Sequence, residues 1–266
     1  MGADTKNLRL RMKSVNSTLH LTKAMGLVAS SKIRRANDQM MRSRAYAAAV
    51  REMIDDLSRS PECAKSPYMQ TNEGVTRLVV IAGDRGLAGG YNANVFRLMK
   101  EFPEAEILPV GKRVCDRVGG DFVSSEAFSY ADSLRLAEEL CRDFAEGKFA
   151  RLGVIRTRYV SMMTQEAEAL WILPLEKSEE AGKKVMLFEP DEATVFQHAV
   201  PLYVAGILYA ASRESFASEV AARRMAMDSA GKNAEQMLED LRLAYNRARQ
   251  GAITQEITEV VAGSDI

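Results

Sequence analysis

The sequence has few of the side chains on which most enzymes and metal proteins depend. It contains only two histidines, His20 and His198, and neither has other ligand-type residues at metal-binding spacing, so a metal site and histidine-based acid–base catalysis are not expected. The three cysteines, Cys63, Cys115 and Cys141, are widely spaced and form no CxxC pair. This usage indicates structural thiols in a reducing, intracellular compartment.

The sequence also lacks a long apolar run and a net charge. No run approaches the roughly 18 apolar residues of a membrane-spanning helix, so we expect any membrane association to come through other subunits. The first residues, MGADTKNLRLRMK, lack the apolar segment of a signal peptide. The net charge of zero argues against a general binder of polyanions, although residues 1–51 carry a clear excess of Lys and Arg.

Proline is absent before Pro61, and the first segment has a regular apolar pattern instead. With Asp4 or Thr5 as the expected N-cap, residues with spacings of four and three alternate along it without a break. This 3.5-residue period is typical of a left-handed coiled coil over residues 1–59. The series is Leu8, Met12, Val15, Leu19, Thr22, Gly26, Ala29, Ile33, Ala36, Met40, Ser43, Ala47, Val50, Ile54 and Leu57. This segment can equally be interpreted as a helix that packs only within its own hairpin. The excess of Lys and Arg on its other faces favours a helix that is also surrounded by an acidic or electronegative surface.

The last segment, residues 199–266, has no proline after Pro201 and is rich in Ala, Leu, Met, Arg, Glu and Gln. A single helix of about 60 residues would be roughly 90 Å long, which requires a partner along its length. The two terminal segments are therefore expected to form an antiparallel two-helix coiled coil that brackets an inserted domain.

The middle of the chain, residues 75–195, reads as a Rossmann-like α/β domain, separated from the first helix by a Pro- and Gly-containing loop at 60–74. The last strands follow one another without a helix, so the sheet should be mainly parallel with an antiparallel part. Strands are expected at 75–83, 105–111, 151–160, 166–175 and 183–190, and helices at 95–100, 112–119 and 133–147.

A glycine-rich turn, GDRGLAGG at 83–90, follows the first expected strand. It matches neither the phosphate loop GxxxxGK[ST] nor the dinucleotide fingerprint GxGxxG. A tight strand-to-helix turn is the favoured interpretation. Since no Ser/His/Asp set can be assembled either, the chain is predicted to have no active site, cofactor or metal of its own.

Uncharged polar residues gather on one stripe of the last helix. Asn246, Gln250, Thr254, Ile257 and Val261 share this stripe, and no lysine follows Lys232. A solvated helix face is usually rich in Glu and Lys, so the pattern favours a surface that contacts another protein.

Three stretches together resemble the gamma (central stalk) subunit of F-type ATP synthase. They are RMKSVNSTLHLTKAMGLVASSKIRRA at 11–36, VVIAGDRGLAGGYNAN at 79–94, and ASEVAARRMAMDSAGKNAEQMLEDLRLAYNRARQGAITQEITEVVAG at 217–263. The resemblance implies a rotor shaft whose terminal helices lie inside a ring of alpha and beta subunits. It implies an α/β domain that contacts the epsilon subunit and the membrane c-ring, with the catalytic sites on the beta subunits. Proton flow would turn the shaft and drive ATP synthesis or hydrolysis.

The same resemblance implies which residues contact the ring: Met25, Arg223, Arg249, Gln250, Thr254 and Glu256, and more loosely Lys23, Arg34 and Arg35. The chain departs from the family at three positions. Ala88 replaces a cysteine of the turn, His20 stands where a basic residue is common, and Gly251 stands where Ala or Ser is usual. The cysteine-bearing insertion of the plant plastid form is absent, so thiol-switched regulation of that kind is not supported.

Two other functions remain open at this point. One is a coiled-coil scaffold or sensor with a nucleotide-binding α/β domain. The other is a nucleic-acid binder that uses the basic first helix, which offers Tyr46 alone as a stacking aromatic. The absence of a transit segment favours a bacterial protein at the inner (cell) membrane, held peripherally at its cytoplasmic face.

Overall fold

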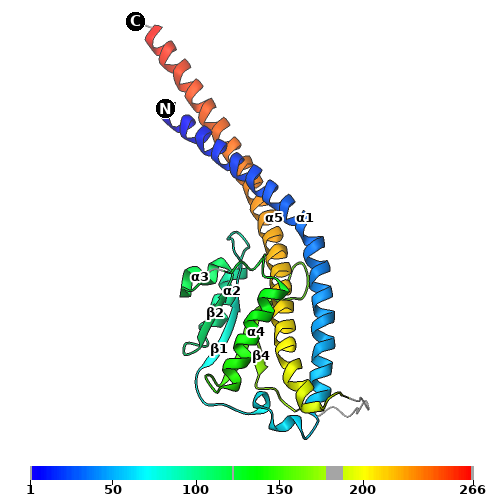
Figure 1. Cartoon of the computed structure of the whole chain (residues 1–266). Coiled ribbons are helices and arrows are strands. Elements are labelled where there is room, and N and C mark those ends of the chain that lie inside the picture. The colour runs from blue at the N-terminus through cyan, green and yellow to red at the C-terminus, as the bar shows by residue number, and fades with distance from the viewer. Residues whose placement is uncertain (1, 122, 178–187, 265–266) are drawn as a thin grey trace. The chain divides into compact units, whose positions relative to one another are not determined.

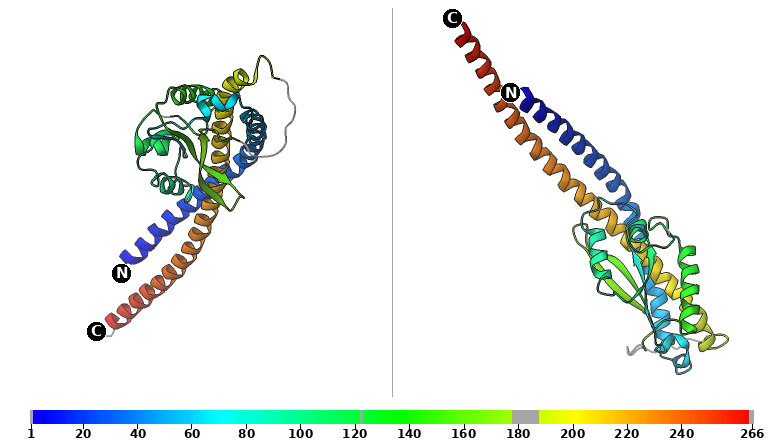
Figure 2. Two further views of the ribbon diagram at one scale, coloured as in Figure 1. Left: turned by 90° about the horizontal axis from the view of Figure 1, so that it is seen from below. Right: turned by 90° about the vertical axis from the view of Figure 1, so that its left-hand side faces the viewer.

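The computed structural model describes residues 2–121, 123–177 and 188–264. The chain divides into two units, one of Met1–Ser30 with Arg224–Ile266 and one of Ser31–Arg223. Two long helices, α1 (Gly2–Ser58) and α5 (Glu192–Ser264), each contribute to both units. Figures 1 and 2 show the elements.

In the first unit, the N-terminal part of α1 runs antiparallel to the C-terminal part of α5 (Figure 2). Leu19 packs with Ala234 and Leu238, and farther toward the N-terminus Arg9 donates a hydrogen bond to the Tyr245 hydroxyl at 3.2 Å. Residues closer to the N-terminus of α1 thus contact residues closer to the C-terminus of α5, so the two helices are antiparallel. The C-terminal end of α5 extends beyond the start of α1, and every described side chain from 253 to 262 is exposed.

The 3.5-residue period predicted for α1 is confirmed by burial. Each position of the series from Leu8 to Leu57 is buried or half-buried, although many of these residues are small. On α5 the same spacing joins Met227, Gly231, Ala234, Leu238, Leu241, Tyr245 and Ala248, which are buried or half-buried. The predicted N-cap is wrong, because α1 begins at Gly2. Asp4 therefore lies within the first turn, where its negative charge interacts favourably with the positive end of the helix dipole.

The second unit contains a four-stranded sheet with the order β2-β1-β3-β4. The central pairs are parallel and β3–β4 is antiparallel, as predicted. The strands are β1 (Thr76–Ile81), β2 (Glu106–Val110), β3 (Arg151–Tyr159) and β4 (Gln165–Leu173), and the helices are α2 (Tyr91–Met99), α3 (Lys112–Val118) and α4 (Tyr130–Ala145). The strand predicted at 183–190 falls largely on 183–187, outside the described residues, and 188–190 are not in a strand.

Side chains alternate along β1 between two apolar clusters, as strand geometry requires. Val79 and Ile81 belong to the larger cluster, which includes residues of α1, α4 and α5 on one face of the sheet. Leu78 and Val80 belong to the smaller cluster on the other face, with Val95 of α2. The core therefore holds the long helices against one face of the sheet within this unit.

The expectation about membrane-spanning segments needs correction. An 18-residue window of α5 reaches a mean hydropathy of 1.3, long and apolar enough by composition to cross a membrane. Because 56% of it is buried within the fold, this part of α5 has the character of a core helix.

The three cysteines are free and buried. Burial raises the pKa of the Cys141 thiol to about 12 and also raises the pKa of Cys63. A raised thiol pKa suppresses the nucleophilic thiolate, so Cys63 and Cys141 pack as small apolar groups.

Candidate functional site on α5 and the glycine-rich turn

The residues predicted to contact a ring lie at several places along the two long helices. Arg249, Gln250 and Thr254 are exposed near the end of α5, and Glu256 lies outside the described side chains. The Thr254 hydroxyl donates to the carbonyl of Gln250 at 2.9 Å, within its own helix. Its donor is therefore used within the helix, whereas the hydroxyl oxygen can still accept a hydrogen bond from a partner.

Apolar side chains are exposed beside these polar ones. Ile253, Ile257, Val260 and Val261 have exposed fractions of 44%, 59%, 71% and 57%. Such a group of exposed apolar residues on a helix end is typical of a surface that another protein covers.

The candidates on α1 differ in their surroundings. Met25 is half-buried, whereas Arg34 and Arg35 are exposed. Lys23 is exposed too, but its ammonium forms an ion pair of 2.7 Å with Glu235 of α5. Part of the basic excess of α1 is thus neutralised within the chain.

Arg223 also contacts its own chain. It is half-buried, forms an ion pair with Glu219 one turn earlier on α5, and donates to the carbonyl of Gly86 in the glycine-rich turn at 3.3 Å. Burial raises the pKa of Glu219, since Arg223 only partly compensates the lost hydration. A Cβ atom at Gly83 would lie 2.8 Å from the Glu219 carboxyl group, so a larger residue there would force that side chain to shift.

Asp84 organises the glycine-rich turn. Its carboxylate accepts hydrogen bonds from the Ser124 hydroxyl at 2.6 Å and from the backbone amides of Ser125 at 3.0 Å and Lys112 at 3.1 Å. Burial alone would raise the pKa of Asp84, but these hydrogen bonds outweigh burial and hold it below its usual value. Open α/β sheets bind ligands at the carboxyl ends of their parallel strands. Here that position, just after β1, is occupied by the protein's own loop, which supports the tight-turn interpretation.

Sequence reasoning missed a row of buried polar residues on α5: Ser212, Arg213, Glu214, Ser215, Ser218 and Glu219. The segment AASRESFASE reads as a solvated helix face, because nothing local indicates what covers it. The guanidinium of Arg213 donates to the carbonyls of Ser125 at 2.9 Å, Phe128 at 3.0 Å and Glu126 at 3.2 Å. Arg213 and Asp84 therefore hold the same loop through its carbonyl and amide groups.

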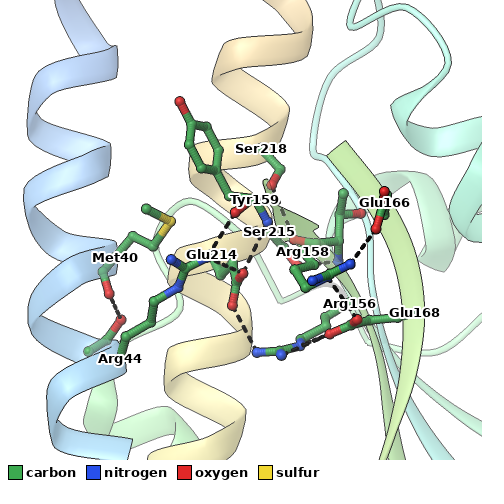
Figure 3. A network of polar contacts seen from close by, with 12 residues as sticks. Met40, Arg44, Arg156, Arg158, Tyr159, Glu166, Glu168, Glu214, Ser215 and Ser218 are labelled. Carbon is green, nitrogen blue, oxygen red and sulfur yellow. Dashed lines mark hydrogen bonds and ion pairs between the residues drawn. The ribbon is translucent and has the colours of Figure 1, made fainter. Parts of the chain in front are cut away.

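Glu214 forms the second part of this row (Figure 3). Its side chain, 2% exposed, accepts from Arg44 of α1 at 2.5 Å and from Arg156 of β3 at 2.8 Å. The backbone amide of Tyr159 donates to it at 3.0 Å. One carboxylate thus joins α1, α5 and the sheet.

The titratable side chains of the described residues are dispersed or engaged by other groups of the protein. Among the residues that the structure describes, no group of three or more His, Cys, Asp or Glu side chains could hold a metal ion. His20 and His198 lie on different helices, and the buried carboxylates are engaged by arginines or backbone amides.

Comparisons with known proteins cover almost the whole chain. A family model described as ATP synthase matches residues 4–265. The ATP synthase gamma chain of Ruminococcus albus is 40% identical over 280 residues, covering 98% of each chain. That of Stenotrophomonas maltophilia is 36% identical over 286 residues, covering 98% of this chain and 99% of the relative. A chain in the Euglena gracilis mitochondrial ATP synthase structure (OSCP/F1/c-ring, rotational state 3) has the same fold, with a TM-score of 0.70 at 18% identity, covering 98% of this chain and 94% of that chain.

Proposed function

Since the chain belongs to the ATP synthase gamma chain family, we propose that it is the central rotor shaft of an F-type ATP synthase. It couples transmembrane proton flow to ATP synthesis or hydrolysis at the beta-subunit catalytic sites by rotating inside the alpha-beta hexamer. The chain itself is non-catalytic. The observation that carries this proposal is the match to gamma chains along the whole length, from the first helix to the exposed end of α5.

The proposed architecture has three parts: residues 1–59 and 199–266 as the two helices of an antiparallel coiled coil, and residues 75–195 as a Rossmann-like α/β domain inserted between them. The 3.5-residue burial period on both α1 and α5 supports the coiled coil. The parallel pairing of β1 with β2 and β3 supports the inserted α/β domain.

The proposed partners are the alpha and beta subunits, the epsilon subunit and the membrane c-ring. Each beta-subunit catalytic site exchanges between conformations, and the face of the shaft that contacts a given beta subunit shifts this equilibrium toward one of them. Membrane association is peripheral, through these partners, at the cytoplasmic face of the bacterial inner membrane. The bacterial relatives support a bacterial complex.

The proposed ring contacts fall into a firmer and a looser group. The exposure of Arg249, Gln250 and Thr254 supports their contact with the ring. For Arg223 and Lys23, contact requires sharing or exchanging their partners Glu219 and Glu235. The full proposed set is Met25, Arg223, Arg249, Gln250, Thr254 and Glu256, with Lys23, Arg34 and Arg35 as the looser group.

The nucleotide-binding scaffold is not favoured. The loop that Asp84 and Arg213 hold in place occupies the position where such a sheet would bind its ligand. Saturable nucleotide binding to the isolated chain would be required to revive that function.

Co-expression tests the proposed function directly. The chain alone should show no ATPase activity, whereas co-expression with the alpha and beta subunits should yield a complex that contains this chain and hydrolyses ATP. Affinity purification through the beta subunit followed by gel filtration is the measurement. If the active complex repeatedly lacks the chain, the proposed function is wrong.

Substitution of Gln250 by Leu, or of Thr254 by Val, should lower ATP turnover by the assembled complex more than it lowers assembly. Each change keeps the side chain's size but removes groups able to form directional hydrogen bonds with a surrounding wall. One or two lost hydrogen bonds correspond to a decrease of roughly threefold to tenfold. Turnover per assembled complex is the measurement. Gln236→Leu, an exposed glutamine on the same helix, provides the control, and equal turnover in all variants would make the stripe merely structural.

A further inference from the structure

The packing of α5 against the sheet changes character along the helix. From Phe196 to Ala211 the buried residues of α5 are apolar and belong to the main core cluster. From Ser212 to Arg223, buried or half-buried polar and charged side chains appear beside the buried apolar residues Ala217, Val220 and Ala221. The two halves restrain the helix differently. Apolar contact is non-directional, whereas hydrogen bonds and ion pairs fix the rotation of a helix about its own axis.

Beyond the end of β1, polar side chains of α5 form hydrogen bonds with the backbone edge of β3. The parallel ladder between β1 and β3 reaches Val80 and Ile155 and then stops. Beyond it, the amide of Thr157 donates to the Ser215 hydroxyl at 3.0 Å, and the Ser218 hydroxyl donates to the carbonyl of Thr157 at 3.1 Å. Side chains of α5 thus occupy hydrogen-bonding positions that another strand would otherwise fill.

Two residues farther along β3, charged groups take the same positions. The amide of Tyr159 donates to Glu214, and its carbonyl accepts from Arg44 of α1 at 3.0 Å (Figure 3). Arg156 reaches the other oxygen of Glu214 and also pairs with Glu168 of β4 at 2.8 Å. We refer to Glu214, Arg44, Arg156 and Tyr159 as the Glu214 network. It connects both long helices to the edge of β3 at one point.

We propose that the Glu214 network is a torsional restraint that transmits rotation from the α/β domain to both long helices. The inference rests on the rotor function proposed above and assigns a positioning role to Glu214 within it. The carboxylate is suited to this role because it is almost fully buried, where low dielectric strengthens its attraction to the two arginines. Its removal leaves those guanidinium groups without their charged partner on α5.

The test uses the complete membrane-bound complex in inverted vesicles. Two quantities are measured together: the rate of ATP hydrolysis and the rate of ATP-driven acidification of the vesicle interior. Glu214→Ala should lower acidification per ATP hydrolysed by at least about threefold, because breaking a buried ion pair removes the restraint outright. Glu214→Gln keeps the shape and some hydrogen bonds but loses the charge, so it should give a smaller decrease in a fully folded shaft.

Leu208→Ala is the matched control. Leu208 is buried in the apolar half of α5, so its truncation weakens packing without touching the network. Thermal unfolding of the isolated chains measures how far each change destabilises the fold. The restraint predicts that Leu208→Ala lowers the melting temperature but leaves acidification per ATP at the level of the unsubstituted protein.

The outcomes separate the two hypotheses. If the unsubstituted chain does not assemble or support acidification, the rotor function itself fails. If it does so, and both Glu214 variants acidify vesicles per ATP as efficiently as Leu208→Ala, the torsional restraint is wrong and the network serves only folding. A selective loss in the Glu214 variants supports the proposal.

Discussion

Replacement of Gly111 by alanine is expected to lower the free energy of unfolding by more than about 3 kcal/mol. Gly111 lies between β2 and α3 with φ of 102°, a conformation that residues with a Cβ atom rarely adopt. An added Cβ would lie only 2.0 Å from the carbonyl oxygen of Ala82, so the backbone after β1 would have to move. Urea unfolding of the purified chain, followed by circular dichroism, measures the change.

Gly251→Ala is the control of opposite sign. Gly251 is exposed within α5, and a Cβ atom there would meet nothing within 4 Å. Alanine loses less conformational entropy than glycine in a helix, so this change should stabilise the chain by about 0.5–1 kcal/mol. Equal stability of the two variants would contradict the assigned role of Gly111.

Arg213→Met should be nearly as damaging, with an expected loss of about 3 kcal/mol. Burial lowers the pKa of Arg213, but its guanidinium remains the donor for the carbonyls of Ser125, Glu126 and Phe128. Methionine fills a similar volume and leaves these carbonyls without that donor. Thermal and urea unfolding of the isolated chain provide the measurement.

Two further variants make this prediction specific. Arg213→Lys keeps the charge but cannot match the fork of the guanidinium, so it should recover only part of the loss. Arg135→Met removes an arginine whose side chain is 77% exposed and pairs with Asp132 at the surface, and it should cost less than about 1 kcal/mol. A small effect of Arg213→Met, similar to that of Arg135→Met, would show that the loop at 124–128 is held by other contacts.

The sequence predicted the parts of the fold that depend on local periodicity. The 3.5-residue series of α1 and the strands of the sheet follow from spacing and composition, which one segment carries by itself. The buried polar row on α5 could not be predicted in this way. Whether Arg213 faces solvent or a loop depends on residues more than 80 positions away, and its sequence neighbours do not report them.

The candidate contact residues show the same division. Arg249 and Gln250 are exposed, as a contact surface requires, but their contact with a ring stays a prediction. Arg223 and Lys23 were singled out by resemblance alone, and their ion pairs with Glu219 and Glu235 emerge only from the fold. Their contact with a ring stays a prediction.

The loop held between Asp84 and Arg213 affects whether metabolites can bind to the sheet. An α/β sheet with an open crevice at its carboxyl edge would change shape with the concentration of any metabolite that bound there. In this chain the crevice is filled by covalently attached residues, whose local concentration never varies. The loop therefore leaves no open crevice at this edge of the sheet in which a metabolite could bind and change the shape of the α/β domain.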